Sequence, residues 1–236
     1  MPPNTVKLLL TSNGITNQSI RHALESLLGK PIGKAKVVFV PTAIYAMPGG
    51  GSYAWQNLED LNKIGWRTVS MLELTALSLE KQHWLPMLQS ADAIMIGGGN
   101  TPYLSYWLQR SGLADELPEL LRTKVYIGVS AGSMVATQEM YVDPAKAKRG
   151  IYDDDQYGDL APVGAGSDKT LRLVDFTLRP HLGADYFEHT SMEEMEKQAA
   201  HTETPLYAID DASAIMVSGG EATIVSEGAW RLFNKT

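Results

Sequence analysis

Short apolar runs alternate with longer amphipathic segments over residues 1–136. The runs have the length of strands and end at glycine, proline or polar residues, which predicts buried β-strands. They cover residues 7–10, 36–40, 67–71, 93–96 and 125–129. The segments between them carry apolar side chains at helical spacing. The predicted helices cover residues 20–28, 54–64, 78–89 and 102–110, with Pro86 expected to break or kink the third.

The pattern changes in the rest of the chain. Residues 143–168 contain many glycines and acidic side chains, which predicts a loop. Ser218-Gly219-Gly220 is typical of the tight turn between two strands of a hairpin. A helix is predicted over residues 192–200. Short apolar runs predict strands over residues 171–174, 206–209, 214–217, 222–225 and 230–233.

The alternation of strands and helices in the first part of the chain predicts a fold class. It favours an α/β fold with three layers, α/β/α, a mostly parallel central sheet and short hairpin strands near the C-terminus. Functional residues in such sheets lie at the carboxyl ends of the strands. Neither a repeat nor a linker interrupts the sequence, so residues 1–236 are expected to form a single domain.

The strand predicted over residues 125–129 runs into Gly128-Val129-Ser130-Ala131-Gly132, followed by a helix-forming stretch. Gly-x-Ser-x-Gly in this context is typical of a nucleophile elbow, a sharp strand-to-helix turn that exposes one serine hydroxyl. The two glycines leave room where strand and helix crowd together. Ser130 would also lie at a helix N-terminus, which favours developing negative charge. The alternative is an ordinary loop serine flanked by glycines.

A serine hydroxyl needs a base, and the base needs an orienting group. Among the five histidines, His181 stands out because it follows an apolar run and lies in a turn between Pro180 and Gly183. Asp210 and Asp211 directly follow another predicted strand, although aspartates also favour plain β-turns. Asp143 is the second candidate for the acid.

The oxyanion of an acyl-transfer reaction needs two donors, usually backbone amides. One candidate is the amide of Ala131, next after the serine. The other is the Gly97-Gly98-Gly99 turn that follows the strand at residues 93–96, where missing side chains let the backbone approach a substrate.

Composition excludes several other classes of function. The net charge of −7 argues against nucleic-acid binding, and the absence of cysteine excludes disulfides and thiolate chemistry. The acidic triplet at residues 153–155 favours a solvated loop over a metal site, and no cofactor is predicted. Neither a signal peptide nor a membrane span is predicted, so a cytoplasmic protein is expected.

The pairing of Ile94-Met95-Ile96-Gly97-Gly98-Gly99-Asn100-Thr101 with the Ser130 motif resembles the peptidase E and cyanophycinase family of serine peptidases. The resemblance implies a class I glutamine amidotransferase-like fold. It also implies Ser130 as nucleophile, His181 as general base, and Gly98 or Gly99 with Ala131 as oxyanion hole. Asp211 stands where the cyanophycinase branch has a glutamate, and Asp143 is the nearest match to an aspartate assigned in peptidase E.

We therefore expect a serine peptidase that hydrolyses small peptides through an acyl-enzyme on Ser130. The resemblance to peptidase E implies dipeptides with N-terminal aspartate as candidate substrates. Such specificity needs a cation, for which Arg149, Arg172 and Arg179 are candidates. Two alternatives stay open: an inactive or regulatory member that binds a small ligand, and an α/β-hydrolase-type esterase dependent on Asp143, since those enzymes run Ser, acid, His along the chain. A monomer and a homodimer are both compatible with the sequence.

Overall fold

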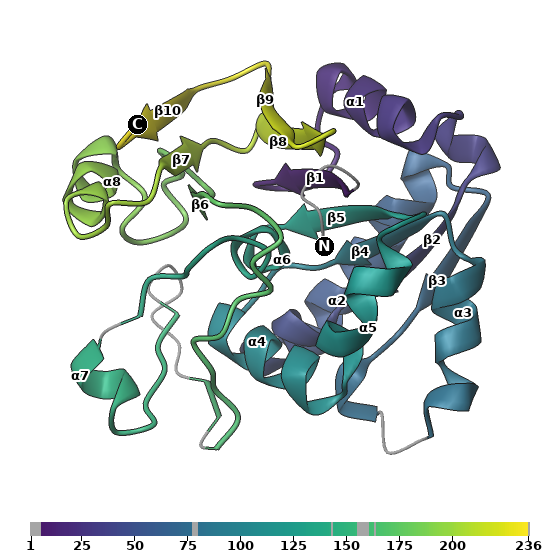
Figure 1. Ribbon diagram of the computed structural model, residues 1–236, viewed down its shortest axis with the longest axis horizontal. Helices are drawn as coiled ribbons and strands as arrows, with labels where there is room; N and C mark the ends of the chain where they lie inside the picture. Colours follow the sequence, from purple (N-terminus) through teal and green to yellow (C-terminus); the bar gives the residue numbers. More distant parts are fainter. Residues whose placement is uncertain (1–5, 77–79, 143, 155–160, 163, 236) are drawn as a thin grey trace.

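The computed structural model describes residues 6–76, 80–142, 144–154, 161–162 and 164–235. Its centre is a seven-stranded sheet with the order β3-β2-β4-β5-β1-β8-β9 (Figure 1). Strands β1 to β5 are parallel to one another, whereas β8 and β9 are antiparallel and lie at one edge. The strands are β1 (Lys7–Thr11), β2 (Lys36–Val40), β3 (Thr68–Met71), β4 (Ala93–Ile96), β5 (Val125–Val129), β8 (Ser213–Ser218) and β9 (Glu221–Ser226).

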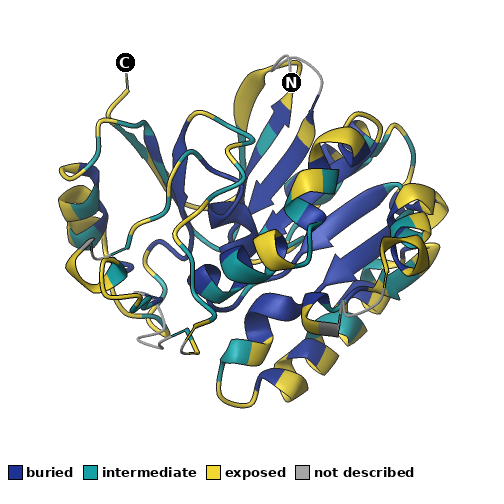
Figure 2. Cartoon of the chain, turned by 60° about the horizontal axis from the view of Figure 1, so that its bottom comes forward, coloured by how far each residue is buried: buried dark blue, intermediate teal, exposed yellow. Residues whose placement is uncertain are grey.

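Helices cover both faces of this sheet, because alternate strand residues point to opposite sides and both sides are apolar. One face packs against α1 (Gln18–Leu28) and α2 (Gly50–Ile64). The other packs against α3 (Leu85–Ser90), α4 (Thr101–Arg110), α5 (Leu113–Leu120) and α6 (Ala131–Met134). Figure 2 shows the buried strands between helices whose outer surfaces are exposed. The predicted three-layer α/β/α fold is confirmed.

A smaller sheet lies beside the main one and has the order β10-β7-β6. It contains β6 (Thr177–Arg179), β7 (Leu206–Ile209) and β10 (Trp230–Phe233), and α8 (Met192–Ala199) packs against it through Met195 and Ala199. A short helix, α7 (Pro144–Ala147), lies between α6 and β6 in the sequence. Four 3₁₀ turns complete the described elements: Ile32–Lys34, Thr42–Ala46, Leu74–Ala76 and Lys81–His83.

Two sequence predictions need correction, and one helix was missed. Residues 171–174 form no strand; the amides of Leu171 and Leu173 instead donate to the carbonyls of Val135 and Ala136. The helix predicted over 78–89 begins only at Leu85, because Pro86 fits the first helical turn, and residues 78 and 79 lie outside the described part. Helix α5 was not predicted, since Pro118 within it interrupts the helical pattern.

The hairpin turn between β8 and β9 was predicted correctly. Ser218 pairs with Glu221, so Gly219 and Gly220 form a two-residue loop, and both have positive φ (62° and 85°). That backbone geometry is the one glycine adopts without strain. No helix in the described part of the chain is long and apolar enough to cross a membrane.

The register of the parallel strands brings three strand ends together. Thr11 at the end of β1 pairs with Val129 of β5, and Ile96 at the end of β4 pairs with Gly128. The residues that directly follow these three strands therefore lie side by side at the carboxyl edge of the sheet, where α/β folds place their functional groups.

Candidate active site

Ser130 lies in a sharp turn between β5 and α6. Its backbone has φ 49° and ψ −110°, a conformation that residues with a side chain rarely adopt. A Cβ added to Gly132 would lie 2.0 Å from the carbonyl oxygen of Ile96, and one added to Gly128 would lie 2.7 Å from Cα of Ser133. Both glycines are required because strand and helix touch there. The helix is short, so its dipole contributes less than the sequence suggested.

His181 lies next to the serine hydroxyl. It directly follows Pro180 after β6, and its Nε2 lies 2.9 Å from Oγ of Ser130. Both residues are only 3% exposed. His181 also has a positive φ of 63°, so a second constrained turn faces the first. A neutral imidazole in this position can accept the hydroxyl proton.

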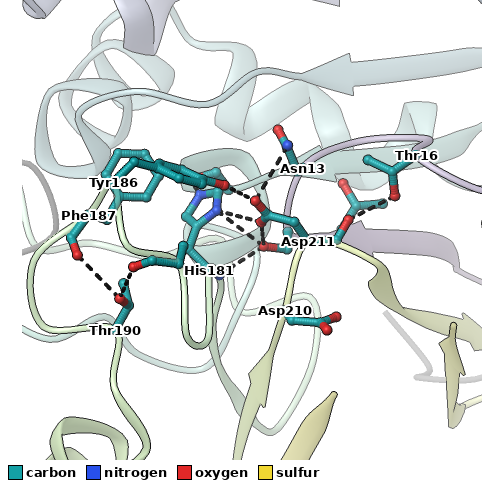
Figure 3. A network of polar contacts seen from close by, with 12 residues as sticks. Asn13, Thr16, His181, Tyr186, Phe187, Thr190, Asp210 and Asp211 are labelled. Atoms are coloured by element: carbon teal, nitrogen blue, oxygen red, sulfur yellow. Dashed lines mark hydrogen bonds and ion pairs between the residues drawn. The ribbon is translucent and has the colours of Figure 1, made fainter. Parts of the chain in front are cut away.

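Asp211 completes a row of three side chains. Its Oδ1 lies 2.7 Å from Nδ1 of His181 (Figure 3). Burial raises the pKa of the Asp211 carboxyl, but the hydrogen bond and charge of His181, together with a hydrogen bond from Ser12, outweigh burial and place that pKa below its ordinary value. The carboxylate is therefore charged near neutral pH and can orient the imidazole.

The neighbouring Asp210 has a different role, although sequence alone could not separate the two. Its Oδ1 accepts bonds from the amide of Ala212 (3.1 Å) and the hydroxyl of Ser213 (2.6 Å), and its Oδ2 accepts from the amide of Ala229 (2.5 Å). Asp210 thus stabilises the turn that aspartates favour, whereas Asp211 contacts the histidine.

The glycine turn after β4 lies against the serine. A Cβ on Gly98 would lie 3.2 Å from Cβ of Ser130, and Gly99 has φ 130° with no room for a side chain beside Ala43. Within the described part of the chain, no residue accepts a hydrogen bond from the amides of Gly98, Gly99 or Ala131. These amides are the donors that the sequence proposed for an oxyanion.

A cavity of about 400 Å³ adjoins this turn. Gly97, Gly98 and Val129 are among the residues that line it, and Gly98 lies against Ser130. Its walls carry both apolar and polar side chains, and Lys63, which forms a 2.9 Å ion pair with Asp60, is the lysine that lines it. The further lining residues are Asn13, Gly14, Ile15, Thr16, Phe39, Asn57, Leu61, Ile64 and Met95.

The arginines proposed as substrate cations lie elsewhere. Arg179 is buried in β6, with Nη1 3.8 Å from Sδ of Met134, and Arg172 lines a separate hollow with Gln138. Arg149 is exposed in a loop. None of the three lines the cavity beside Gly98.

Of the other acidic residues singled out in the sequence, some lie outside the described part of the chain and one has an outcome. Asp143 lies outside the described residues, as does the last member of the triplet at 153–155. The prediction of a solvated loop is wrong for Asp154, which is 2% exposed. Its Oδ2 accepts bonds from the amide (2.9 Å) and hydroxyl (3.1 Å) of Thr101, at the start of α4.

Three residues around Asp211 were missed by the sequence analysis. The hydroxyl of Ser12 donates to Oδ1 of Asp211 at 2.6 Å, and the side-chain amide of Asn13 donates to Oδ2 at 3.5 Å. The hydroxyl of Tyr186 also donates to Oδ2 (Figure 3). A signal existed: polar residues 11–13 directly follow the first strand, at the same edge of the sheet as Ser130.

Comparison with known proteins identifies the family of the chain. The sequence model of peptidase family S51 matches residues 8–225 of the chain. The chain belongs to peptidase family S51. It is therefore a serine peptidase, and this family assignment does not favour the ligand-binding or α/β-hydrolase alternatives.

Relatives of this S51 peptidase cover nearly its whole length. It is 26% identical to a peptidase E of Streptomyces coelicolor, over 98% of this chain and 88% of the relative. It is 27% identical to a probable alpha-aspartyl dipeptidase of Drosophila melanogaster, over 96% and 88%. A crystal structure of a putative peptidase E from Listeria monocytogenes shares the fold, with a TM-score of 0.68 and 22% identity over 94% of this chain and 99% of the other.

Proposed function

We propose that Ser130, His181 and Asp211 are the catalytic triad of this peptidase. His181 Nε2 takes the proton of the Ser130 hydroxyl as Oγ attacks the peptide carbonyl carbon. The same proton then passes to the leaving amine as the C–N bond breaks, which leaves an acyl group on Ser130. Water attacks this ester with His181 again as base, and the acid product leaves. Asp211 keeps the imidazole oriented throughout.

One observation carries this proposal: the three side chains form a continuous row, 2.9 Å from Ser130 Oγ to His181 Nε2 and 2.7 Å from His181 Nδ1 to Asp211 Oδ1. These separations are within hydrogen-bond reach, which proton transfer requires. The amides of Ala131 and of Gly98 or Gly99 are the proposed oxyanion donors. One such donor contributes about 3–4 kcal/mol to transition-state stabilisation.

We further propose that the substrates are dipeptides with N-terminal aspartate. Support comes from the similarity to the Drosophila relative, a probable alpha-aspartyl dipeptidase. The cavity of about 400 Å³ beside Gly98 is also of a size suited to a small ligand. Since Lys63 lines that cavity and the three arginines do not, Lys63 is our candidate cation for a substrate carboxylate.

A dipeptide panel tests this proposal. Asp-Leu should be cleaved with kcat/KM at least about tenfold above that of Asn-Leu, because loss of one charged contact costs ~1.4 kcal/mol or more. Ser130→Ala should abolish turnover while the protein stays folded, and Lys63→Gln should raise KM for Asp-Leu with little change in kcat. Equal rates for Asp-Leu and Asn-Leu would refute the substrate assignment. Turnover by Ser130→Ala would refute the triad.

A further inference from the structure

Among the described residues, the carboxylate of Asp211 has four hydrogen-bonding neighbours, one of which is the histidine. Oδ1 receives Nδ1 of His181 at 2.7 Å and the hydroxyl of Ser12 at 2.6 Å. Oδ2 receives Nδ2 of Asn13 at 3.5 Å and the hydroxyl of Tyr186. In Figure 3, Asn13 and Tyr186 converge on the outer side of this carboxylate. Ser12 differs from these two because it also contacts His181.

Ser12 bridges the acid and the base. Its Oγ accepts a hydrogen bond from the backbone amide of His181 at 2.8 Å, and it is completely buried. The same oxygen lies 3.3 Å from Nδ1 of His181 and 2.6 Å from Oδ1 of Asp211. A serine hydroxyl has a single proton to donate. The shorter distance and the negative charge of the carboxylate direct that proton to Asp211.

This single proton has a consequence for His181. Because the hydroxyl proton of Ser12 points at Asp211, it does not occupy the lone-pair direction of Nδ1. Nδ1 then carries its own hydrogen toward Asp211, and Nε2 is left as an acceptor facing Ser130. A neutral imidazole can act as base on Ser130 only in this tautomer.

We infer that Ser12 is a positioning residue of the triad, which fixes the separation and orientation of His181 and Asp211 and leaves Nδ1 of His181 free to donate to Asp211. The inference rests on the proposed triad and extends it to a fourth side chain. The side-chain contacts of Ser12 are with His181 and Asp211, so it acts through the histidine and the aspartate.

The fold holds Ser12 in place from both sides. It follows β1, whose last residue, Thr11, accepts a hydrogen bond from the amide of Ser130 at 3.1 Å. The amide of Ser12 itself donates to the carbonyl of Ser213, the first residue of β8, at 3.4 Å. Ser12 thus links the strand beside the nucleophile to the histidine and aspartate, which come from the smaller sheet.

The pH dependence of activity should report this role. The titratable groups that contact Asp211 are His181 and Tyr186, and Asp210 and Glu227 line the hollow on its outer side. Removing the Ser12 donor makes the carboxylate a stronger acceptor for the imidazole proton. The His181–Asp211 pair then keeps its shared proton to higher pH, so the midpoint of the acidic limb of the rate profile should shift to higher pH.

The test compares three variants by their rate of labelling with a fluorophosphonate probe between pH 5 and pH 9. Ser12→Ala removes the hydroxyl, and Ser12→Cys keeps its shape but donates only weakly. Ser105→Ala is the matched control, because Ser105, in α4, is as buried as Ser12. Its hydroxyl donates to the carbonyl of Lys169 at 2.5 Å and not to a residue of the triad. Thermal unfolding of each variant is measured alongside.

Ser12→Ala should label about 10–100-fold more slowly than wild type, since a hydrogen bond to a charged group is worth roughly 1.5–3 kcal/mol. The midpoint of its acidic limb should rise by about half a pH unit. Ser12→Cys should fall between the two, and Ser105→Ala should label like wild type.

Wild-type rate and midpoint in Ser12→Ala would overturn the inference while leaving the triad intact. A slower rate with an unchanged midpoint, matched by Ser105→Ala at equal loss of melting temperature, would also overturn it, because both serines would then be merely structural. Failure of the proposed function has a different signature: folded wild-type protein would take no label at Ser130, and the inference would fail with it.

Discussion

The two halves of the proposed triad are positioned by different physical means. Ser130 is positioned by packing: Gly128 and Gly132 allow β5, α6 and β4 to touch, and a single added carbon would lie 2.0 Å from a carbonyl oxygen. His181 and Asp211 are positioned by hydrogen bonds, with Ser12 between them. The turn at Ser130 depends on glycines that have no side chain, whereas the positions of His181 and Asp211 depend on hydrogen bonds between polar side chains.

This contrast predicts how each region responds to substitution. Interiors are close-packed, so adding an atom near Ser130 should lower the free energy of unfolding. Removing a polar atom near Asp211, which is partly accessible to water, should lower activity more than stability. Four substitutions or conditions can break or sharpen the comparison.

The largest expected effect is on activity at Asp211. Asp211→Asn leaves the shape but favours the wrong histidine tautomer, so kcat/KM for Asp-Leu should fall about 10³–10⁴-fold. The melting temperature should change little. Asp210→Asn is the matched control, since among the described residues the Asp210 carboxylate bonds to Ala212, Ser213 and Ala229 and not to His181. This variant should stay within about fivefold of wild type. Equal losses in both variants would contradict the division between the two aspartates.

The next effect is on stability at the serine turn. Gly132→Ala should lower the free energy of unfolding by about 3 kcal/mol or more, because the added Cβ overlaps Ile96 and the backbone must shift. Gly51→Ala is the control: a Cβ there meets no atom within 4 Å. It should change stability by less than about 1 kcal/mol. Urea unfolding of both variants decides, and a stable Gly132→Ala protein would show that packing does not fix the turn.

Much of the fold follows from the sequence because it rests on local patterns. The strand at 125–129 and its Gly-x-Ser-x-Gly turn are specified by neighbouring residues, and so is the Gly219-Gly220 hairpin. β6 was missed because it has only three residues, Thr177–Arg179, too few for a periodic signal.

The site was only partly predictable, since its contacts join distant parts of the chain. Ser130 and His181 carry local turn signals, and both have the positive φ that such turns require. Ser12 and Asp211 are 199 positions apart, and nothing local tells Asp211 from Asp210. Their difference appears only once β1 and β7 end near each other. Asp154 was misjudged for the same reason, because its partner Thr101 is 53 positions away.

A third, smaller effect should appear at acidic pH. The pKa of Asp211 is lower in the folded protein than its ordinary value of about 3.9, so its charge stabilises the fold above that pH. This contribution is lost as pH falls through the lower, folded pKa. The stability of wild type relative to Asp211→Asn should therefore be constant near neutrality and decline below about pH 4. Chemical unfolding between pH 3 and pH 7 measures it, and a flat difference would exclude the His181 and Ser12 contacts as the cause.

The smallest effect is expected for Tyr186→Phe. Tyr186 donates to Asp211, but it is 58% exposed, so water can replace its hydroxyl. Its loss should lower kcat/KM by only about two- to fivefold, the value of one neutral donor at an exposed site. Tyr53→Phe, at an equally exposed tyrosine on α2, is the control. A loss of activity as large as that of Ser12→Ala would show that the exposed hydrogen bond from Tyr186 matters as much for activity as the buried one from Ser12.

The central claim is that Ser130 is the nucleophile and that His181 activates it. Mass spectrometry of the protein after fluorophosphonate treatment tests this most directly. We expect one adduct per chain, on the peptide that contains Ser130, and none in folded His181→Ala protein. An adduct on another residue, or full peptidase activity in protein whose Ser130 carries the adduct, would contradict the account.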